Sequence, residues 1–253
     1  MSDVGLIAVA TAVALQKVLG PVSEEVGEEI RRIYKAGREK ILASAYRKLE
    51  NPDDGKQANL RVAQDVLWNG AFTDDEVCAE YFGGILASSR SEDGKDDSNI
   101  QYSSVIKSLS SSQLRLHYLI YNVFNKMLVT RKMTLNVGQG HEVKKHSIWF
   151  SSRELMATYH IEAETGLNGL LQQGLVSAYK TKTRLNIDGI PLYYCKANPT
   201  TFGVLLYAAA HNRMSEWRAF TKIDFGNFES IPTPQFFGAT LDELMQAHNE
   251  ADT

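Results

Sequence analysis

The sequence predicts a mainly α-helical fold, with an N-terminal helical bundle followed by a winged-helix-like α+β domain that carries a β-hairpin wing. Three observations predict it. Apolar residues recur at helical spacing through most of residues 20–131, capping-box helix starts recur along the chain, and extended segments appear only beyond residue 132. We therefore expect a bundle at 1–131, a winged-helix-like domain at 132–211 and an aromatic-rich tail with a short helix at 212–253.

The composition is that of a soluble globular protein. The chain has 253 residues, of which 43% are hydrophobic, and 27 Lys and Arg against 30 Asp and Glu give a net charge of −3. This balance excludes a global cationic field that would attract nucleic acid or an anionic membrane. Cys78 and Cys195 form no CxxC pair, which favours reduced thiols and a cytoplasmic location.

The first segment, Val4–Leu19, is apolar almost all round a helix. Asp3 stands where a signal peptide would be basic, and the segment is shorter than the roughly 20 residues of a spanning helix. We expect a buried helix, and a self-association surface or a membrane-active segment remains open. In either of those alternatives, the contacting residues would be Leu6, Ile7, Val9, Val13 and Leu15.

Two helices are expected next. Gly20-Pro21 breaks the first segment, and Ser23 caps a long amphipathic helix over Glu24–Leu49. Its basic residues are interspersed with five acids, a pattern typical of a solvated face rather than a nucleic-acid surface. A turn at Asn51–Gly55 leads to a shorter helix from Leu60 to Trp68.

The next stretch holds the clearest helix-start signals. Thr73-Asp-Asp-Glu76 has capping-box spacing and predicts a helix from Asp74. Gly83-Gly84 within it predicts a close approach of another backbone, because each glycine costs a helix roughly 1 kcal/mol. The acidic loop over 91–99 is expected to be solvated.

A short helix is then expected over Tyr102–Leu109, and Ser110-Ser-Ser-Gln113 is a second capping box that starts a longer helix. Cys78 and His117 lie on apolar stripes of the two capped helices, so we expect both in the core rather than in a catalytic pair.

Beyond residue 132 the pattern indicates a winged-helix order. Residues 133–150 are expected to form two extended pieces about the glycine turn Gly138-Gln-Gly140, and Ser151 to Glu154 is a third capping box. Two helices, a stop at Gly174, a hairpin about Asn186–Gly189 and a closing helix over Thr200–His211 follow. Helix, turn, helix, hairpin and helix is the order of a winged-helix module.

Because winged-helix modules can bind DNA, we consider which residues would contact it. The residues placed to contact nucleic acid are two on the second helix and three on the wing: Asn168, Gln172, Lys180, Lys182 and Arg184. The helix itself carries no Lys or Arg, although phosphate contacts usually dominate affinity. A structural or protein-interaction role is therefore favoured, and DNA binding remains an alternative.

The sequence lacks the short motifs that mark the common classes of enzyme. The sequence contains no Walker A motif, nucleophile elbow, HExxH or zinc-finger spacing, and Gly138-Gln-Gly140 lacks the third glycine of a nucleotide loop. His141, Glu142 and His146 are better explained as solvated residues than as metal ligands. We therefore expect no catalytic, cofactor or metal site, and no enzyme activity.

Two segments together resemble a known family. Residues Asp74-Asp-Glu-Val-Cys-Ala-Glu-Tyr-Phe-Gly-Gly-Ile-Leu-Ala-Ser-Ser89, followed by Tyr102-Ser-Ser-Val-Ile-Lys-Ser-Leu-Ser-Ser-Ser-Gln-Leu-Arg-Leu116, resemble the Abi-alpha (abortive infection alpha) family of bacterial proteins. The Leu175-Val and Phe202-Gly-x-x-Leu205 landmarks extend the resemblance over residues 20 to 210. It implies a role in resistance to bacteriophage and brings no catalytic residues with it.

We expect a non-enzymatic defence protein that acts as a sensing, oligomerising or protein-interaction scaffold, with a protein partner or self-association. Two alternatives stay open. One is a membrane-acting toxin that uses residues 4–19, and the other is a winged-helix DNA-binding regulator. The trigger, the partner and the oligomeric state are not defined by the sequence.

Overall fold

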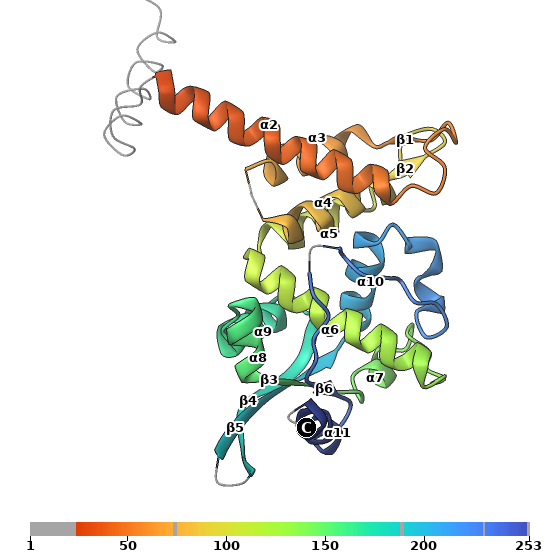
Figure 1. The fold of residues 1–253 in the computed structure, drawn as a ribbon. Coiled ribbons are helices and arrows are strands. Elements are labelled where there is room, and N and C mark those ends of the chain that lie inside the picture. The colour runs from red at the N-terminus through yellow and green to blue at the C-terminus, as the bar shows by residue number, and fades with distance from the viewer. Residues whose placement is uncertain (1–23, 73–74, 188–189, 230, 252–253) are drawn as a thin grey trace, which may run out of the picture.

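The computed structural model describes residues 24–72, 75–187, 190–229 and 231–251, and the described chain is mainly α with small antiparallel sheets (Figure 1). Its helices are α2 (Glu24–Arg47), α3 (Leu60–Gly70), α4 (Glu76–Ser88), α5 (Ile100–Lys107), α6 (Ser111–Thr130), α7 (Gly140–Val143), α8 (Ser152–Tyr159), α9 (Ala163–Gln172), α10 (Thr201–Ala210), the 3-10 turn η1 (Met214–Ala219) and α11 (Leu241–Ala251). Its strands are β1 (Gln57–Ala58), β2 (Arg90–Ser91), β3 (Ile148–Ser151), β4 (Val176–Ile187), β5 (Ile190–Pro199) and β6 (Phe237–Gly238).

The larger sheet has the strand order β4-β5-β3-β6, and each pairing is antiparallel. β4 and β5 form a long hairpin, and β3 lies beside β5 with Phe150 opposite Cys195. Helices α8 and α9 connect β3 to β4 and pack on this sheet together with α6. Segments from residue 111 to residue 238 therefore share one α+β unit.

Helix α6 is the axis of the molecule. Ser110 begins it with a complete capping box, in which the Ser110 hydroxyl accepts from the Gln113 N–H and the Gln113 side chain accepts from the Ser110 N–H. Of its 20 residues 13 are buried, and it packs against α4, α9, α10, β3 and β5. A helix buried on most sides belongs in the centre of a fold, and Figure 1 shows α6 crossing the middle of the molecule.

Close backbone approach explains the glycine pair of α4. A Cβ on Gly83 would lie 2.6 Å from the Ser44 side chain of α2, and one on Gly84 would lie 1.9 Å from the carbonyl oxygen of Ala210 at the end of α10. The absence of side chains lets α4 sit directly against both helices, so its core contacts offset the cost of two helical glycines. The prediction of a close approach is confirmed.

The segment after α10 returns across the molecule as a C-terminal strap, residues 212–240, which α6 holds by side-chain amides. Asn125 Nδ2 donates to the carbonyls of Phe220 (2.6 Å) and Ile223 (2.9 Å), and its Oδ1 accepts from the Phe225 N–H at 2.9 Å. Asn122 Nδ2 donates to the Gly226 carbonyl at 3.0 Å. Burying the strap's backbone is tolerable because these amides replace the lost water.

A carboxylate on α8 fixes the far end of the strap. Glu154 is 9% exposed, and its two oxygens accept from the N–H groups of Gln235 (2.6 Å) and Phe236 (3.0 Å). Burial raises the pKa of Glu154, although the two backbone hydrogen bonds lower it. The strap's aromatic residues Phe220, Phe225 and Phe228 are buried, so they pack on their own chain.

Most of the expected helix starts are confirmed. The Ser151 side chain caps α8, and the Thr200 side chain caps α10. Helix α9 ends at Gln172, and Gly174 just beyond it has a φ of +69°, which suits a residue without Cβ. Cys78 and His117 are both buried, as expected.

Other local expectations are wrong in part. Helix α4 begins at Glu76 and is capped by the Asp75 side chain, which accepts from the Val77 N–H, while Thr73 lies outside the described residues. Of the two extended pieces expected over residues 133–150, the second is confirmed as β3, but the first is not a strand and the expected glycine turn leads into the short helix α7. Before that helix, the Asn136 N–H donates to the Glu142 carboxylate at 3.2 Å. The expected helix over Leu60–Trp68 does form, as α3: its Val62 and Val66 are buried, whereas Leu60 is 83% and Trp68 63% exposed.

The apolar segment Val4–Leu19 lies outside the described residues. Among the helices that are described, none has the length and hydropathy needed to cross a bilayer.

The packing of α4 on α10 generates a first prediction. Gly84→Ala should lower the free energy of unfolding by several kcal/mol, because the new methyl group meets the Ala210 backbone, which no rotamer change can move. Chemical denaturation measures the change. Gly140→Ala is the control, since its Cβ would meet only Thr201 Oγ1, at 3.7 Å. Equal stability of both variants and the wild type would contradict the packing described.

Candidate functional site

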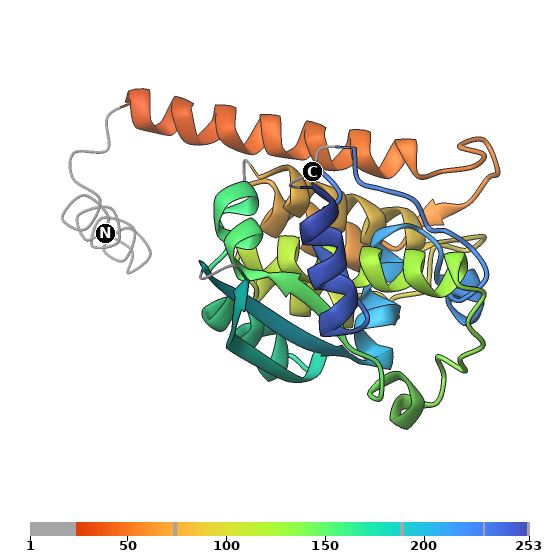
Figure 2. The ribbon, with the colours of Figure 1, turned by 60° about the horizontal axis from the view of Figure 1, so that its bottom comes forward.

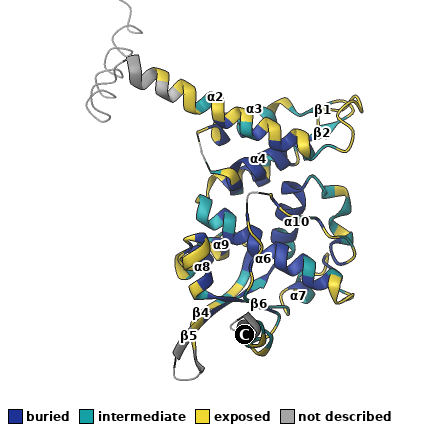
Figure 3. Ribbon diagram, viewed as in Figure 1, coloured by how far each residue is buried: buried dark blue, intermediate teal, exposed yellow. Residues whose placement is uncertain are grey.

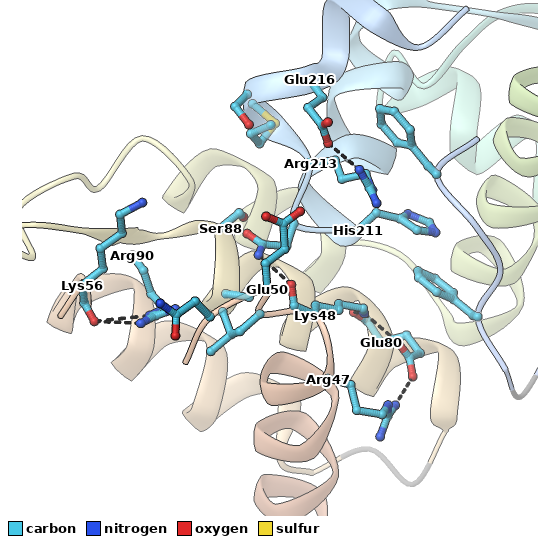
Figure 4. Close-up of a pocket in the computed structure, with 18 of the residues that line it drawn as sticks. Arg47, Lys48, Glu50, Lys56, Glu80, Ser88, Arg90, His211, Arg213 and Glu216 are labelled. Atoms are coloured by element: carbon cyan, nitrogen blue, oxygen red, sulfur yellow. Dashed lines mark hydrogen bonds and ion pairs between the residues drawn. The ribbon is translucent and has the colours of Figure 1, made fainter. Parts of the chain in front are cut away.

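A polar cleft of about 830 Å³ lies where α2, α4 and α10 end and the strap begins (Figure 4). Residues from four segments line it: the end of α2 and the following turn, the end of α4 with Arg90, the end of α10 with η1, and the strap at 225–229. Its lining residues range along the chain from residue 47 to residue 229.

Three helices point their C-terminal ends at this cleft. Arg47 is the last residue of α2, Ser88 the last of α4, and His211 the C-cap of α10. Each helix end carries partial negative charge on carbonyls that lack intrahelical partners. Some are satisfied locally, because Asn212 Nδ2 donates to the Lys48 carbonyl at 2.9 Å.

A buried ion pair forms the wall next to α4. Lys48 Nζ lies 2.6 Å from Glu80 Oε2, and it also donates to the Glu80 carbonyl at 2.6 Å and to Ser44 Oγ at 3.0 Å. Arg47 Nη2 reaches the other Glu80 oxygen at 2.5 Å. The side chains of Lys48 and Glu80 are 12% and 8% exposed, so this pair is largely removed from water.

The pKa values of the pair follow from that burial. Burial lowers the pKa of Lys48 to about 8, although attraction to Glu80 opposes the change. Burial raises the pKa of Glu80, but Lys48, Ser44 and Arg47 outweigh it and leave that pKa below its ordinary value. Glu80 is therefore charged at neutral pH, and Lys48 loses its proton at a lower pH than an exposed lysine.

Aromatic rings form the adjoining wall. The Phe228 ring stacks on His211, with centroids 4.5 Å apart and planes 12° from parallel, and Lys48 Nζ lies 4.7 Å from the centroid of Phe228. The Arg213 guanidinium lies over Phe225 at 5.8 Å. Both contacts have the geometry of cation–π interactions.

His211 is neutral in this wall. Burial, with the positive charge of Lys48, lowers its pKa to about 3. Nδ1 lies 2.9 Å from the Tyr207 carbonyl, which can only accept, so Nδ1 carries the proton and Nε2 keeps its lone pair. That Nε2 atom has no hydrogen-bond partner among the described residues.

The remaining charges divide into paired and unpaired groups. Arg90 pairs with Asp54 at 2.5 Å, and Arg213 with Glu216 at 2.5 Å. Three more charged residues line the cleft without an ion pair to another described residue: Glu50, Glu229 and Lys56. Figure 4 draws Glu50 in the middle of the cleft, between the Arg90 side and the Arg213 side.

The lining suits binding better than bond making. Ser88 Oγ donates to the Ile85 carbonyl of its own helix at 3.3 Å rather than to a base. Lys48, the amine with a lowered pKa, has its donors engaged by Ser44 and Glu80. Over the described residues, no group of three or more His, Cys, Asp or Glu side chains is placed to hold a metal ion.

The residues expected to contact nucleic acid are exposed on α9 and β4, which pack together. Asn168 and Gln172 lie on α9, and Lys180, Lys182 and Arg184 project at alternate positions of β4. Lys182 Nζ forms an ion pair with Glu164 of α9 at 2.6 Å, and this pair raises the pKa of Lys182. Part of the positive charge of β4 is thus neutralised by the helix beside it.

The other expected contact residues, Leu6, Ile7, Val9, Val13 and Leu15, lie outside the described residues. Cys78 and His117 do not form a site together: the Nδ1 atom of His117 hydrogen-bonds the Tyr81 hydroxyl instead.

Sequence reasoning missed the cleft. One signal for it was available, because Glu80 is the single charge between Val77 and Ser88, in the most apolar part of α4. A charge in such a run needs a partner. Lys48 lies 32 residues away on another helix, however, and spacing alone does not connect the two.

No family model, curated protein or solved structure matches the chain.

The buried pair generates a second prediction. Glu80→Gln should lower the free energy of unfolding by about 3 kcal/mol at pH 7, because it leaves the Lys48 charge buried with no carboxylate. The loss should be smaller at pH 10, where Lys48 is neutral in the folded protein. Denaturation at the two pH values measures both effects.

The direction in which the stability of the wild type changes with pH follows from the same pKa of Lys48. Unfolded Lys48 titrates near 10.5 and folded Lys48 near 8, so the unfolded chain binds more protons between these values and this group makes stability rise with pH there. Glu76→Gln is the matched control, since Glu76 pairs with Lys40 at the surface and should contribute no more than about 1 kcal/mol. A pH-independent loss in Glu80→Gln would contradict the assignment.

Proposed function

We propose that the chain is a non-enzymatic bacterial protein of phage defence, of the abortive-infection type, that senses a ligand through the cleft. The resemblance of residues 74–89 and 102–116 supplies the biological role. The observation that carries the sensing role is the cleft itself, which gathers three helix C-termini and two unpaired carboxylates around an aromatic wall.

The charges of the cleft select the ligand. Arg47, Lys48, Arg90 and Arg213 each pair with an acid, whereas Glu50 and Glu229 face only Lys56 as an unpaired group of the described lining. Each helix C-terminus adds partial negative charge. The formal charges of the lining balance, with five basic and five acidic residues, because Arg47 and Lys48 share Glu80. The helix ends then make the cleft weakly negative, and we propose a ligand that carries ammonium or guanidinium groups.

The aromatic wall contributes shape rather than a further cation site. Lys48 and Arg213 of this chain lie over Phe228 and Phe225, and these rings are only 2% and 5% exposed. The unpaired carboxylates are therefore the groups that would hold a ligand cation. No covalent step is needed, and a flexible molecule with two cationic groups can reach both unpaired carboxylates.

We further propose that α6, β3, α8, α9, β4 and β5 form a winged-helix module. The supporting observations are the helix pair between β3 and β4, the hairpin that follows it, and the strand order β4-β5-β3. Its role is protein contact, because α9 exposes Glu164 and Asn168 and no Lys or Arg, and Glu164 holds Lys182.

The two alternative functions, a DNA-binding regulator and a membrane-acting toxin, can each be tested separately. A DNA-binding regulator would bind with a steep salt dependence that weakens when Lys180, Lys182 and Arg184 are neutralised. A membrane-acting toxin would require the apolar segment at residues 4–19, which lies outside the described residues, to cause leakage of vesicles.

The cleft generates a third prediction. Calorimetric titration with spermidine should show binding that Glu50→Gln and Glu229→Gln each weaken about fivefold, equal to about 1 kcal/mol for a half-exposed ion pair. Glu92→Gln is the charge-matched control, because Glu92 is exposed in the loop over 91–99, away from the cleft. Equal affinity of the wild type and the three variants for spermidine would show that the cleft is not the binding site. The same titration with a basic peptide distinguishes a protein ligand from a free polyamine.

Phage resistance gives a fourth prediction. Expression of the wild type in a susceptible bacterium should lower the plating efficiency of a phage, and the Glu50→Gln, Glu229→Gln double variant should lose that protection while Glu92→Gln keeps it. Plaque counts and protein levels are measured together. Protection by the double variant at normal protein level would separate the defence role from the cleft.

A further inference from the structure

Three aromatic rings from α2 and α3 form an exposed cluster. This ring cluster consists of Tyr34 of α2, Trp68 of α3 and Phe72 just after α3, with centroids 5.2 Å apart for Tyr34 and Phe72, 6.0 Å for Tyr34 and Trp68, and 6.2 Å for Trp68 and Phe72. Trp68 is 63% exposed and Phe72 51%. Single exposed apolar residues are ordinary, but a contiguous group of them marks a contact surface.

The ring cluster belongs to the outermost layer of the molecule. Helix α2 runs along one edge of the fold and packs inward on α3 and α4 (Figures 1 and 2). Most of its described residues are exposed (Figure 3). Of the nine large apolar side chains that are exposed in the described part of the chain, six lie on α2, on α3 or at Phe72. The exposure of large apolar groups is therefore concentrated on one outer side instead of being spread over the surface.

The charge beside the ring cluster is positive. Arg31 stands three residues before Tyr34 and Arg38 four residues after it, so the helix places all three side chains on one face. Both arginines are exposed, and neither forms an ion pair with another residue that the structure describes. The Arg38 guanidinium lies over the Tyr34 ring, 5.9 Å from its centroid. Two uncompensated cations thus border the rings.

The described acids of this region lie elsewhere or are already paired. Glu28 and Glu39 stand six residues before Tyr34 and five after it, which places them roughly 120–140° around the helix from it. The described acids of α3 and of the start of α4 are each held by a cation: Asp65 by Lys107, Asp75 by Arg115 and Glu76 by Lys40. The positive border of the ring cluster therefore remains available to an anionic partner.

Exposed rings with a basic border fit the surface of an anionic bilayer. Trp and Tyr favour the boundary between lipid and water, and an arginine near anionic headgroups adds attraction. A single-stranded nucleic acid fits less well, because base stacking needs a free ring face. Here the planes of Trp68 and Phe72 lie at 82° and those of Tyr34 and Trp68 at 62°, so these rings meet edge to face and cover one another in part.

We propose that the ring cluster, together with Arg31 and Arg38, docks the protein on an anionic phospholipid membrane. Trp68 and Phe72 enter the interface, and the two arginines contact lipid phosphates. The net charge of −3 gives the rest of the protein no general attraction to such a surface, so docking fixes one orientation. This docking face lies on α2 and α3, and its action does not depend on ligand binding in the cleft.

Flotation of the full-length protein with vesicles tests the proposal. The wild type should float with vesicles of equal parts phosphatidylcholine and phosphatidylglycerol, and not with pure phosphatidylcholine. Arg31→Gln and Arg38→Gln should each weaken binding about fivefold, because each arginine loses its attraction to the anionic surface. Trp68→Ser with Phe72→Ser should weaken it by at least about tenfold, because the apolar contact is lost.

Matched controls come from the hairpin of β4 and β5. Lys180→Gln with Arg184→Gln removes two exposed cations, and Tyr193→Ser removes a ring that is 45% exposed. Both controls should float as the wild type does. Thermal unfolding followed by circular dichroism shows that each variant is folded.

Each other result overturns the proposal. No flotation of the wild type, or equal flotation with both kinds of vesicle, shows that no anionic surface is bound. Flotation that the ring and arginine variants retain in full assigns the contact to another part of the chain. If vesicles are not bound but a single-stranded oligonucleotide or a second copy of the chain is, and Trp68→Ser with Phe72→Ser removes that binding, the face serves that partner instead.

A second measurement locates Trp68 without removing a ring from the cluster. Phosphatidylglycerol with brominated acyl chains should quench the tryptophan emission of the bound wild type. Trp68→Phe should still float but lose most of this quenching, since Trp149 lies on β3 and Trp217 in η1, outside the docking face. Equal quenching of the bound wild type and the bound Trp68→Phe variant would place a different tryptophan in the membrane and overturn the proposal.

Discussion

The fold depends on a single helix whose side chains hydrogen-bond a distant part of the backbone. Helix α6 is buried on most sides, yet it carries Asn122 and Asn125, which sit in the core because the strap places carbonyls and an N–H group against them. An unpaired buried amide costs about 1–3 kcal/mol. Helix and strap are therefore stable only together, and the polar groups allow one register between them.

The contact between α6 and the strap also fixes the shape of the cleft. The Tyr118 hydroxyl of α6 accepts from the Phe228 N–H at 3.0 Å, and the Tyr118 ring stacks on Phe228 with centroids 4.5 Å apart. Phe228 stacks in turn on His211. The aromatic wall is thus fixed from behind by α6, while the ion pair of Lys48 and Glu80 fixes the other wall. A ligand that enters meets preorganised walls, which reduces the entropy lost on binding.

Local signals predicted much of this fold, and long-range contacts account for what they missed. The capping box at Ser110, the cap at Thr200 and the glycine pair of α4 each depend on neighbours within a few residues or on close packing, and all were visible in the sequence. Asn125 meets Phe220 over a separation of 95 residues, and Lys48 meets Glu80 over 32. No periodicity connects such pairs, so neither strap nor cleft could be derived. The failure of the first extended piece, before Gly138, has a different cause. The Asn136 N–H donates to the Glu142 carboxylate and the Gly138 N–H to Asn136 Oδ1, and such local side-chain bonds compete with strand pairing.

Helix α2 connects the cleft with a cluster of three rings. Its last residues, with Lys48, build the cleft, and Tyr34, ten to fourteen residues earlier, contacts Trp68 and Phe72. A helix of 24 residues is about 36 Å long and stiff. Gly37 of α2 lies against Ala71 at the end of α3, and Gly83 of α4 lies against Ser44 of α2, so a shift of α2 against either neighbour would clash. A change at Tyr34 therefore reaches the cleft only through movement of α2, α3 and α4 as one body. Any coupling between the ring cluster and the cleft would have to appear as a change at the contact of α4 with Ala210, the point where that body meets α10.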